Sequence, residues 1–270
     1  MNSHTTTSTP SEPQLFRRAF HSSLTHTERE YWLYLPRGHW DDDTLWPVIL
    51  FLHGGGERGE DLEKVLEHGP IKEVANGRDL PFIVIAPQMP GRPGNAPSVS
   101  GRRPRPSGKR QPLVRQSLGK APSWGSLGPP SGWHEGESDL LTILEDVLRV
   151  YHADADRVYL TGLSYGGFGT WYMAMHHPDR WAAAAPICGA GDPSQVHKIG
   201  KLPVWLFQGG RDNLVLPEWS LKTADALDRA DGDVRVTVHE DLGHDCWTRA
   251  YGGQDLYDWF LSHSRRPSAE

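Results

Sequence analysis

Short apolar runs recur along the chain, and they lack the polar alternation of a strand with one face in water. The runs lie at residues 47–53, 81–87, 158–161, 182–187 and 204–207, with a weaker one at 234–238. Strands that are buried on both faces, as in a parallel sheet, have this character. An aromatic-rich run at residues 30–36 ends on a proline and predicts an early strand near a sheet edge.

Helical periodicity fills the intervals between these runs. Apolar residues from Leu140 to Tyr151 follow i, i+3, i+4 and i+7 spacings, with Ser138 as the predicted N-cap. Further helices are expected after Ser164, over residues 219–230 and over residues 255–261. Strands that alternate with helices indicate βα crossovers. The chain is therefore predicted to be one α/β domain with a mostly parallel central sheet flanked by helices.

One segment interrupts this order. Residues 91–132 hold eight basic and no acidic residues, and 23 of these 42 residues are Gly, Pro or Ser. Because the whole chain has a net charge of −6 and this segment contributes eight positive charges, the rest of the chain has a net charge of −14. This composition predicts a disordered insertion; a lid over a site and a basic arm for an anionic partner are the alternatives. Its arginines lie among prolines and are not interleaved with stacking aromatics, so no nucleic-acid partner is expected.

The ends of the chain are polar. We expect flexible tails at residues 1–14 and 264–270 around a domain at residues 15–263. No apolar run approaches the length of a membrane span, and no secretory signal is visible, which predicts a cytoplasmic protein without a membrane partner. Cys188 and Cys246 are expected to be reduced thiols, although their pairing stays open. No metal-ligand spacing or phosphate-binding glycine motif occurs, so neither a metal nor a cofactor is predicted.

The sharpest motif is the sequence GLSYGG at residues 162–167. It follows the predicted strand at residues 158–161 and precedes a helical pattern. A serine on such a strand-to-helix turn projects beyond the sheet, and glycines two residues away on either side make room for the strained backbone. Ser164 is therefore the predicted nucleophile.

A serine hydroxyl needs a base, and the base needs an orienting acid. In this topology the acid and then the histidine follow the serine along the chain. Asp212 comes directly after the apolar run at residues 204–207 and is the preferred acid. His244 lies in a loop after the last predicted strand and is the preferred base. The competing residues stand in turns, in a strand or in the tail: Asp192, Asp231, Asp233, His239 and His263.

An oxyanion intermediate needs two hydrogen-bond donors. One is expected to be the backbone N–H of Tyr165, next to the nucleophile. The other should come from the glycine loop after the first buried strand, with Gly55 favoured over Gly54. His53, which precedes these glycines, is interpreted as a structural part of the loop.

Four segments in this order resemble the α/β-hydrolase superfamily: LHGGGERG at residue 52, GLSYGGFGTW at 162, PICGAGD at 186 and GHDCWT at 243. The resemblance covers residues 15–263 apart from the insertion. It is strongest to the carboxylesterase, dienelactone-hydrolase-like and predicted peptidase branch that borders on prolyl oligopeptidase catalytic domains. The resemblance implies a Ser164–Asp212–His244 triad and an oxyanion hole formed by the glycine loop and Tyr165.

Two departures from the family pattern bear on specificity. Relatives pass from the stretch before Gln88 to the next helix through a short loop that contains a tryptophan, where this chain has the insertion and Trp133. Substrate contacts are therefore expected from Gln88, Trp133 and, beside the histidine, Trp247. Dienelactone hydrolases proper use a cysteine nucleophile, whereas this chain has Ser164.

The predicted function is hydrolysis of small carboxylic esters through an acyl-enzyme. A short-chain or aryl ester is favoured, because no propeller domain that would enclose peptides and no long apolar lid are visible. A peptidase or amidase that uses the same triad is the alternative, followed by a non-catalytic binding protein with the same fold. The oligomeric state is not predicted.

Overall fold

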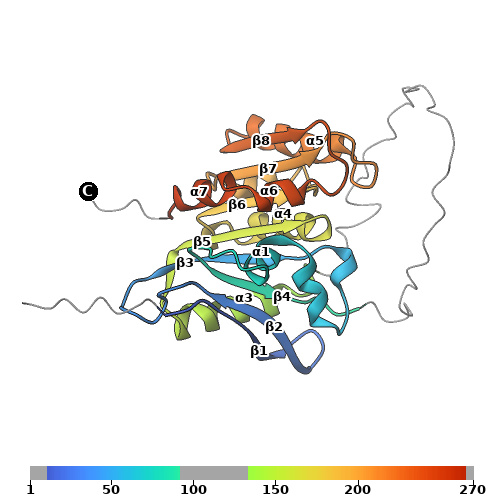
Figure 1. Cartoon of the computed structure of the whole chain (residues 1–270). Coiled ribbons are helices and arrows are strands. Elements are labelled where there is room, and N and C mark those ends of the chain that lie inside the picture. Colours follow the sequence, from blue (N-terminus) through green and yellow to red (C-terminus); the bar gives the residue numbers. More distant parts are fainter. Residues whose placement is uncertain (1–10, 92–132, 266–270) are drawn as a thin grey trace, which may run out of the picture.

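The computed structural model describes residues 11–91 and 133–265. An eight-stranded sheet forms its centre, with the spatial order β1-β2-β4-β3-β5-β6-β7-β8. Figure 1 shows β1 and β2 at one edge of the sheet and β8 at the other. The strands are β1 (Gln14–Ser22), β2 (Thr27–Leu35), β3 (Trp46–Leu52), β4 (Ile83–Pro87), β5 (Ala153–Leu163), β6 (Ala183–Ile187), β7 (Val204–Gly209) and β8 (Val234–His239).

Strand pairing is parallel from β4 through β3 and β5 to β8, whereas β1 pairs antiparallel with β2 and β2 antiparallel with β4. Every residue of β4, β6 and β7 is buried, because helices cover both faces of the sheet there. This burial accounts for the apolar runs that do not alternate. The predicted α/β class with a mostly parallel sheet is confirmed.

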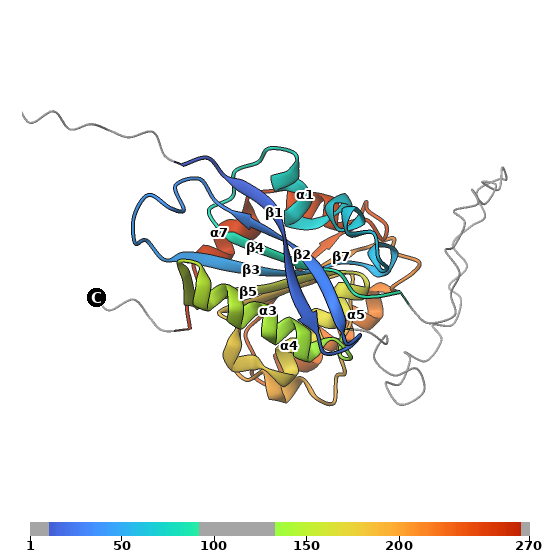
Figure 2. The ribbon, with the colours of Figure 1, turned by 90° about the horizontal axis from the view of Figure 1, so that it is seen from below.

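The helices form two layers, one on each face of the sheet. Figure 2 shows α3, α4 and α5 on one side and α1 and α7 on the other. Each layer packs on its own hydrophobic core. The core under α3 and α4 includes Trp171, and the core under α1 and α7 includes Tyr257. The helices are α1 (Gly69–Ala75), α3 (Glu137–Val150), α4 (Tyr165–His176), α5 (Pro217–Arg229), α6 (Trp247–Gly252) and α7 (Asp255–Leu261).

The aromatic run became β2, which lies beside the edge strand β1, so the prediction of a strand near a sheet edge is confirmed. Other local features were missed or misplaced. The charged, half-exposed sequence of β1 gave no clear strand pattern, and the short helices α1 and α6 were missed. Helix α3 begins at Glu137 with Gly136 as its N-cap, so Ser138 lies inside the first turn.

The described structure extends slightly beyond the predicted domain at both ends. Strand β1 begins at Gln14, one residue before the expected start of the domain. Arg265, which was assigned to the C-terminal tail, donates its backbone N–H to the Asp156 carbonyl at 2.9 Å. Of the predicted insertion at residues 91–132, all but residue 91 lies outside the described residues, as do residues 1–10 and 266–270. Among the described residues, no helix is long and apolar enough to cross a membrane.

Candidate active site

Ser164 stands at the sharp turn between β5 and α4. Its φ of 52° and ψ of −114° lie outside the regions that most residues other than glycine adopt. The turn is tight because its two glycines contact backbone directly. A Cβ on Gly162 would lie 2.5 Å from the Gly166 carbonyl oxygen, and one on Gly166 would lie 1.8 Å from the Leu52 oxygen. The backbone thus holds the Ser164 hydroxyl at the carboxyl end of the sheet.

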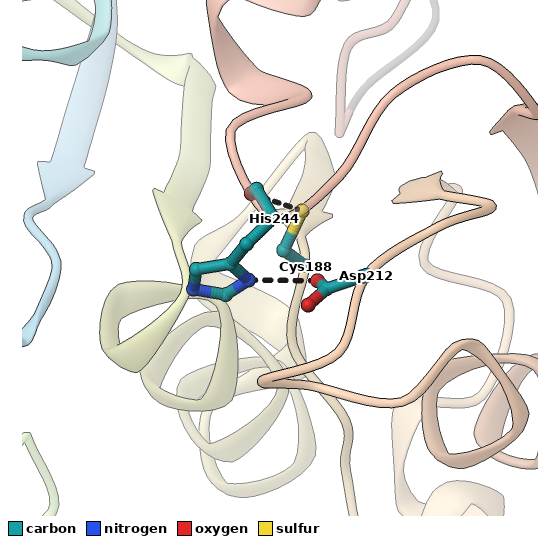
Figure 3. Close-up of side chains that lie close together, drawn as sticks. All are labelled: Cys188, Asp212 and His244. Atoms are coloured by element: carbon teal, nitrogen blue, oxygen red, sulfur yellow. Dashed lines mark hydrogen bonds and ion pairs between the residues drawn. The ribbon is translucent and has the colours of Figure 1, made fainter. Parts of the chain in front are cut away.

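The structure brings the three predicted catalytic side chains together. His244 Nε2 lies 2.8 Å from Ser164 Oγ, and His244 Nδ1 lies 2.7 Å from Asp212 Oδ2. Asp212 follows β7 and His244 follows β8, so three parallel strands bring distant parts of the sequence to one edge. Figure 3 shows the imidazole of His244 pointing its Nδ1 at the Asp212 carboxylate.

The Asp212 carboxylate is held from several sides. Its Oδ1 accepts the backbone N–H groups of Leu214 and Val215 at 2.9 and 3.0 Å, and Gln208 Nε2 donates to Oδ2 at 3.2 Å. Burial of the side chain favours the neutral acid, but the hydrogen bonds to His244 and to these backbone groups outweigh it and lower the pKa of Asp212. The group is therefore an ionised carboxylate in a fixed orientation.

The charge on Asp212 acts on His244. Burial disfavours the charged imidazolium, but the hydrogen bond to Asp212, the neighbouring Cys188 and the negative charge of Asp212 together outweigh it and raise the pKa of His244 to about 9. The Trp247 ring lies edge-to-face against the imidazole, with ring centroids 5.1 Å apart. The imidazole is thus fixed in position and is well suited to hold a proton taken from Ser164.

The competing residues have other roles in the structure. Asp192 accepts the N–H and hydroxyl of Ser194 at 2.9 and 2.7 Å, which forms a local turn. Asp231 is an exposed partner of Lys201. His239 ends β8, and His263 bonds to the Trp259 carbonyl at 2.7 Å.

The glycine loop after β3, residues 54–56, lies against the turn between β5 and α4 that carries Ser164. A Cβ on Gly55 would lie 3.8 Å from the Cβ of Tyr165, so these two residues are neighbours, as a shared oxyanion site requires. His53 is fully buried and accepts the Met89 N–H through Nε2 at 2.9 Å, which leaves Nδ1–H to donate to the Gly54 carbonyl at 2.6 Å. Burial lowers the pKa of His53 to about 4, so it is a neutral structural residue of the loop.

Two of the three expected substrate contacts are buried supports of this loop. Gln88 Nε2 donates to the carbonyls of Glu57 and Asp61, both at 2.7 Å. The Trp133 indole N–H donates to the His53 carbonyl at 3.3 Å, and the Trp133 side chain is 1% exposed. That Gln88 or Trp133 contacts the substrate stays a prediction, and the observed contacts of both side chains are with the loop backbone.

Two residues beside the glycines were not singled out from the sequence, although they follow the motif directly. The Glu57 carboxyl is buried between two imidazoles, 3.9 Å from His53 Nδ1 and 3.8 Å from His68 Nε2. Burial raises the pKa of Glu57. The Arg58 guanidinium lies 5.1 Å from the centre of the Tyr165 ring and donates to its hydroxyl at 3.1 Å. Arg58 therefore links the glycine loop to the turn that carries Ser164, whereas Glu57 packs against histidines beside the loop.

Two groups of possible metal ligands lie within the described ranges, namely Cys188, Asp212 and His244, and Glu57, Glu67 and His68. In the first group the facing atoms of Asp212 and His244 already share a hydrogen bond, so a metal ion there would break the Ser164–His244–Asp212 chain. The second group includes the exposed carboxylate of Glu67. Exposed acidic groups are common on protein surfaces where no metal ion binds.

The chain is similar to known hydrolases. Residues 134–205 match the Prolyl oligopeptidase family. A poly(3-hydroxyalkanoate) depolymerase C from Paucimonas lemoignei is 43% identical over 63 residues, and dipeptidyl-peptidase 5 from Porphyromonas gingivalis is 26% identical over 162 residues. These matches cover 22% and 56% of this chain but only 15% and 18% of the two curated proteins.

A solved structure described as a thermostable esterase matches most of this chain. It is 29% identical with a TM-score of 0.66, and the match covers 93% of this chain and 63% of that chain. Strand order, the strained serine turn and these relatives agree with the family expected from the sequence motifs. The chain has the α/β-hydrolase fold and is similar to the branch of that superfamily that includes esterases, dienelactone-hydrolase-like proteins and prolyl oligopeptidase-like enzymes.

Proposed function

We propose that the chain is a serine hydrolase that cleaves carboxylic esters, with Ser164 as nucleophile, His244 as general base and Asp212 as the orienting acid. The unbroken hydrogen-bond chain from Asp212 through His244 to Ser164 Oγ carries this proposal. The names of the esterase and depolymerase relatives support it. A binding protein that had lost its activity would have no chemical need for this chain of contacts.

The proposed reaction begins when Ser164 Oγ attacks the ester carbonyl carbon while His244 Nε2 takes the hydroxyl proton. The carbonyl oxygen becomes negative and accepts the backbone N–H groups of Gly55 and Tyr165, the latter at the first position of α4. His244 then gives its proton to the leaving alcohol. Water attacks the acyl-enzyme by the same steps, and Asp212 stays ionised throughout.

The substrate that we favour carries an aryl or short acyl group. The Trp247 ring lies beside the proposed reaction centre, with its centroid 5.1 Å from that of His244 and 5.5 Å from that of His68. Flat aromatic or small apolar groups pack well on such surfaces.

The cytoplasmic location stays a prediction from the sequence.

The direct test is hydrolysis of p-nitrophenyl acetate together with labelling by a fluorophosphonate probe. Ser164→Ala should lower kcat by at least about 10⁴-fold and abolish labelling. Ser194→Ala, which removes an exposed hydroxyl from a turn, should change neither. Normal hydrolysis by Ser164→Ala, or no labelling of the folded wild-type protein, would contradict the proposal.

Amide hydrolysis is the second candidate function. The Prolyl oligopeptidase family match over residues 134–205 and the dipeptidyl-peptidase relative favour it. A matched pair of substrates with the same acyl group, one a p-nitrophenyl ester and one a p-nitroanilide, separates the two activities. Turnover of the anilide at a rate comparable to that of the ester would establish the peptidase type of chemistry.

A further inference from the structure

The chain contains two cysteines, 58 residues apart, and the fold brings them into contact. Cys188 follows the end of β6 and Cys246 precedes α6, two residues after His244. Both side chains are fully buried, and their sulfur atoms lie 2.8 Å apart. Nothing in the proposed ester hydrolysis uses either thiol.

Cys188 is held firmly toward its partner. Its backbone has a φ of 49°, a left-handed conformation that residues other than glycine rarely adopt. Its N–H donates to the Phe207 carbonyl at 2.9 Å, which ties it to β7. Its thiol lies 3.2 Å from the carbonyl oxygen of His244. A dashed line in Figure 3 marks this contact. The conformation therefore places a sulfur atom between the end of the sheet and the turn that carries the catalytic histidine.

We propose that Cys188 and Cys246 are a modification site at which a reversible disulfide ties the His244 turn to the end of β6. The bond would close a loop of chain that contains both Asp212 and His244. Two of the three proposed catalytic residues would then lie inside one cross-linked segment. This inference goes beyond the proposed ester hydrolysis and does not depend on it.

The oxidant is a small-molecule disulfide of the glutathione class, which reacts by thiol–disulfide exchange. One cysteine sulfur attacks the oxidant and forms a mixed disulfide, and the other cysteine sulfur displaces the second small thiol. One S–S bond forms in the protein while the S–S bond of the oxidant breaks. Two electrons pass to the oxidant, and the protons of both cysteines leave with the two small thiols.

The folded protein should exchange slowly. The hydrogen bond to Cys246 and burial raise the pKa of the Cys188 thiol far above its usual value, so its thiolate is scarce at neutral pH. The oxidant must also reach sulfur atoms that the core covers. Local opening of the turn before α6, a helix of six residues, would expose Cys246 first.

Oxidation should stabilise the protein against heat. A disulfide that closes a loop of this length restricts the unfolded chain, and in a domain of this size the melting temperature should rise by roughly 5–10 °C. The thiol of Cys188 no longer donates to the His244 carbonyl after oxidation, but the new bond holds the same turn covalently. Reduction should reverse the gain.

The test counts thiols in the full chain. Reduced protein is incubated with oxidised glutathione, both folded and during refolding from denaturant, and then labelled with a maleimide under denaturing conditions. We expect two labelled thiols before oxidation and none after it, loss of two hydrogen atoms by mass, a monomer on a non-reducing gel and the higher melting temperature. Cys188→Ser and Cys246→Ser, each with one thiol, should gain no heat resistance from the same treatment.

Folded wild-type protein that keeps two free thiols after both treatments would overturn the proposal. So would cross-linking between chains, or an oxidised protein that melts no higher than the reduced one. If the chain does not refold, the incubation of folded protein decides alone. Because thiol counts and melting do not depend on turnover, failure of the proposed esterase activity would leave this result standing.

Discussion

His244 Nδ1 lies 2.7 Å from Oδ2 of the buried Asp212 carboxylate, and this contact sets the proton positions at the site. With Nδ1 protonated toward Asp212, Nε2 is free to accept the Ser164 proton. Asp212→Asn keeps the shape of the side chain, but its amide N–H can donate to His244 Nδ1. The imidazole then carries its proton on Nε2, where it cannot accept the proton of Ser164. We expect kcat for ester hydrolysis to fall by about 10³- to 10⁴-fold with the fold retained.

Asp192→Asn is the matched control for this change. It alters a carboxylate in a surface turn after β6, and the turn can keep its hydrogen bonds to Ser194 through the amide oxygen. Steady-state kinetics and circular dichroism on both variants check the expectation. An Asp212→Asn enzyme with wild-type kcat would remove Asp212 from the proposed mechanism.

The pH profile should reflect the raised pKa of His244. In the proposed mechanism Ser164 is activated only while the imidazole is neutral, and Asp212 together with Cys188 raises the pKa of His244 from 6.5 to about 9. Activity should therefore rise with pH across the neutral range, and its midpoint should lie well above 6.5. The measurement is kcat/KM against pH for a stable acetate ester, with NMR titration of His244 in Ser164→Ala as a second readout. A midpoint at or below 6.5 would contradict the assigned electrostatics.

The same shifts affect stability. A raised pKa of His244 adds stability that is complete below the unfolded value of 6.5 and is lost as pH rises through about 9. The lowered pKa of Asp212 adds stability above its unfolded value of 3.8 and loses it as pH falls through the lower folded value. Urea unfolding of wild type and His244→Gln from pH 5 to 10 should show the histidine contribution vanish at the alkaline end. A constant difference between the two proteins over that range would argue against it.

Gly166 should tolerate no side chain. A Cβ there would lie 1.8 Å from the Leu52 carbonyl oxygen, and because both sides of the contact are backbone, neither can move aside cheaply. Gly166→Ala should destabilise the protein by about 3 kcal/mol and disrupt the serine turn. Gly56→Ala is the control, since a Cβ on Gly56 meets no atom within 4 Å. Chemical denaturation should separate the two variants, and equal stabilities would refute the close-contact argument.

Asp139 should matter for stability without taking part in the reaction. This buried carboxylate on α3 accepts the Ser22 hydroxyl at 2.6 Å and both the N–H and the hydroxyl of Ser23 at 2.7 Å. Asp139→Ala leaves these donors unpaired and should cost about 2–4 kcal/mol of unfolding free energy.

Asp146→Ala on the same helix is the control for Asp139→Ala. It removes an exposed partner of Arg149 and should cost under about 0.5 kcal/mol. Each folded variant should keep the wild-type kcat at 25 °C. A comparable loss of stability in both variants would show that the buried contacts of Asp139 add little.

Much of the architecture was readable from local sequence. The apolar runs at β3, β4, β6 and β7 predict strands because burial on both faces leaves no place for polar residues. The GLSYGG motif predicts the serine turn because only small residues fit where two backbones touch, as the contact of Gly166 with Leu52 shows. By contrast, β1 escaped prediction because an exposed, charged edge strand is formed by its pairing with β2 and has no strong local pattern.

The sequence by itself determined the order and the chemical types of the groups at the candidate site, namely a serine at a tight turn, then an aspartate and then a histidine after successive strands. Only the tertiary structure decided which atoms meet, because distances between residues so far apart in the chain depend on how the strands align in the sheet. That alignment brings Ser164 and His244 within hydrogen-bond distance and buries Gln88 and Trp133 under the glycine loop. It also places Cys188 against Cys246, a contact that no local pattern encodes.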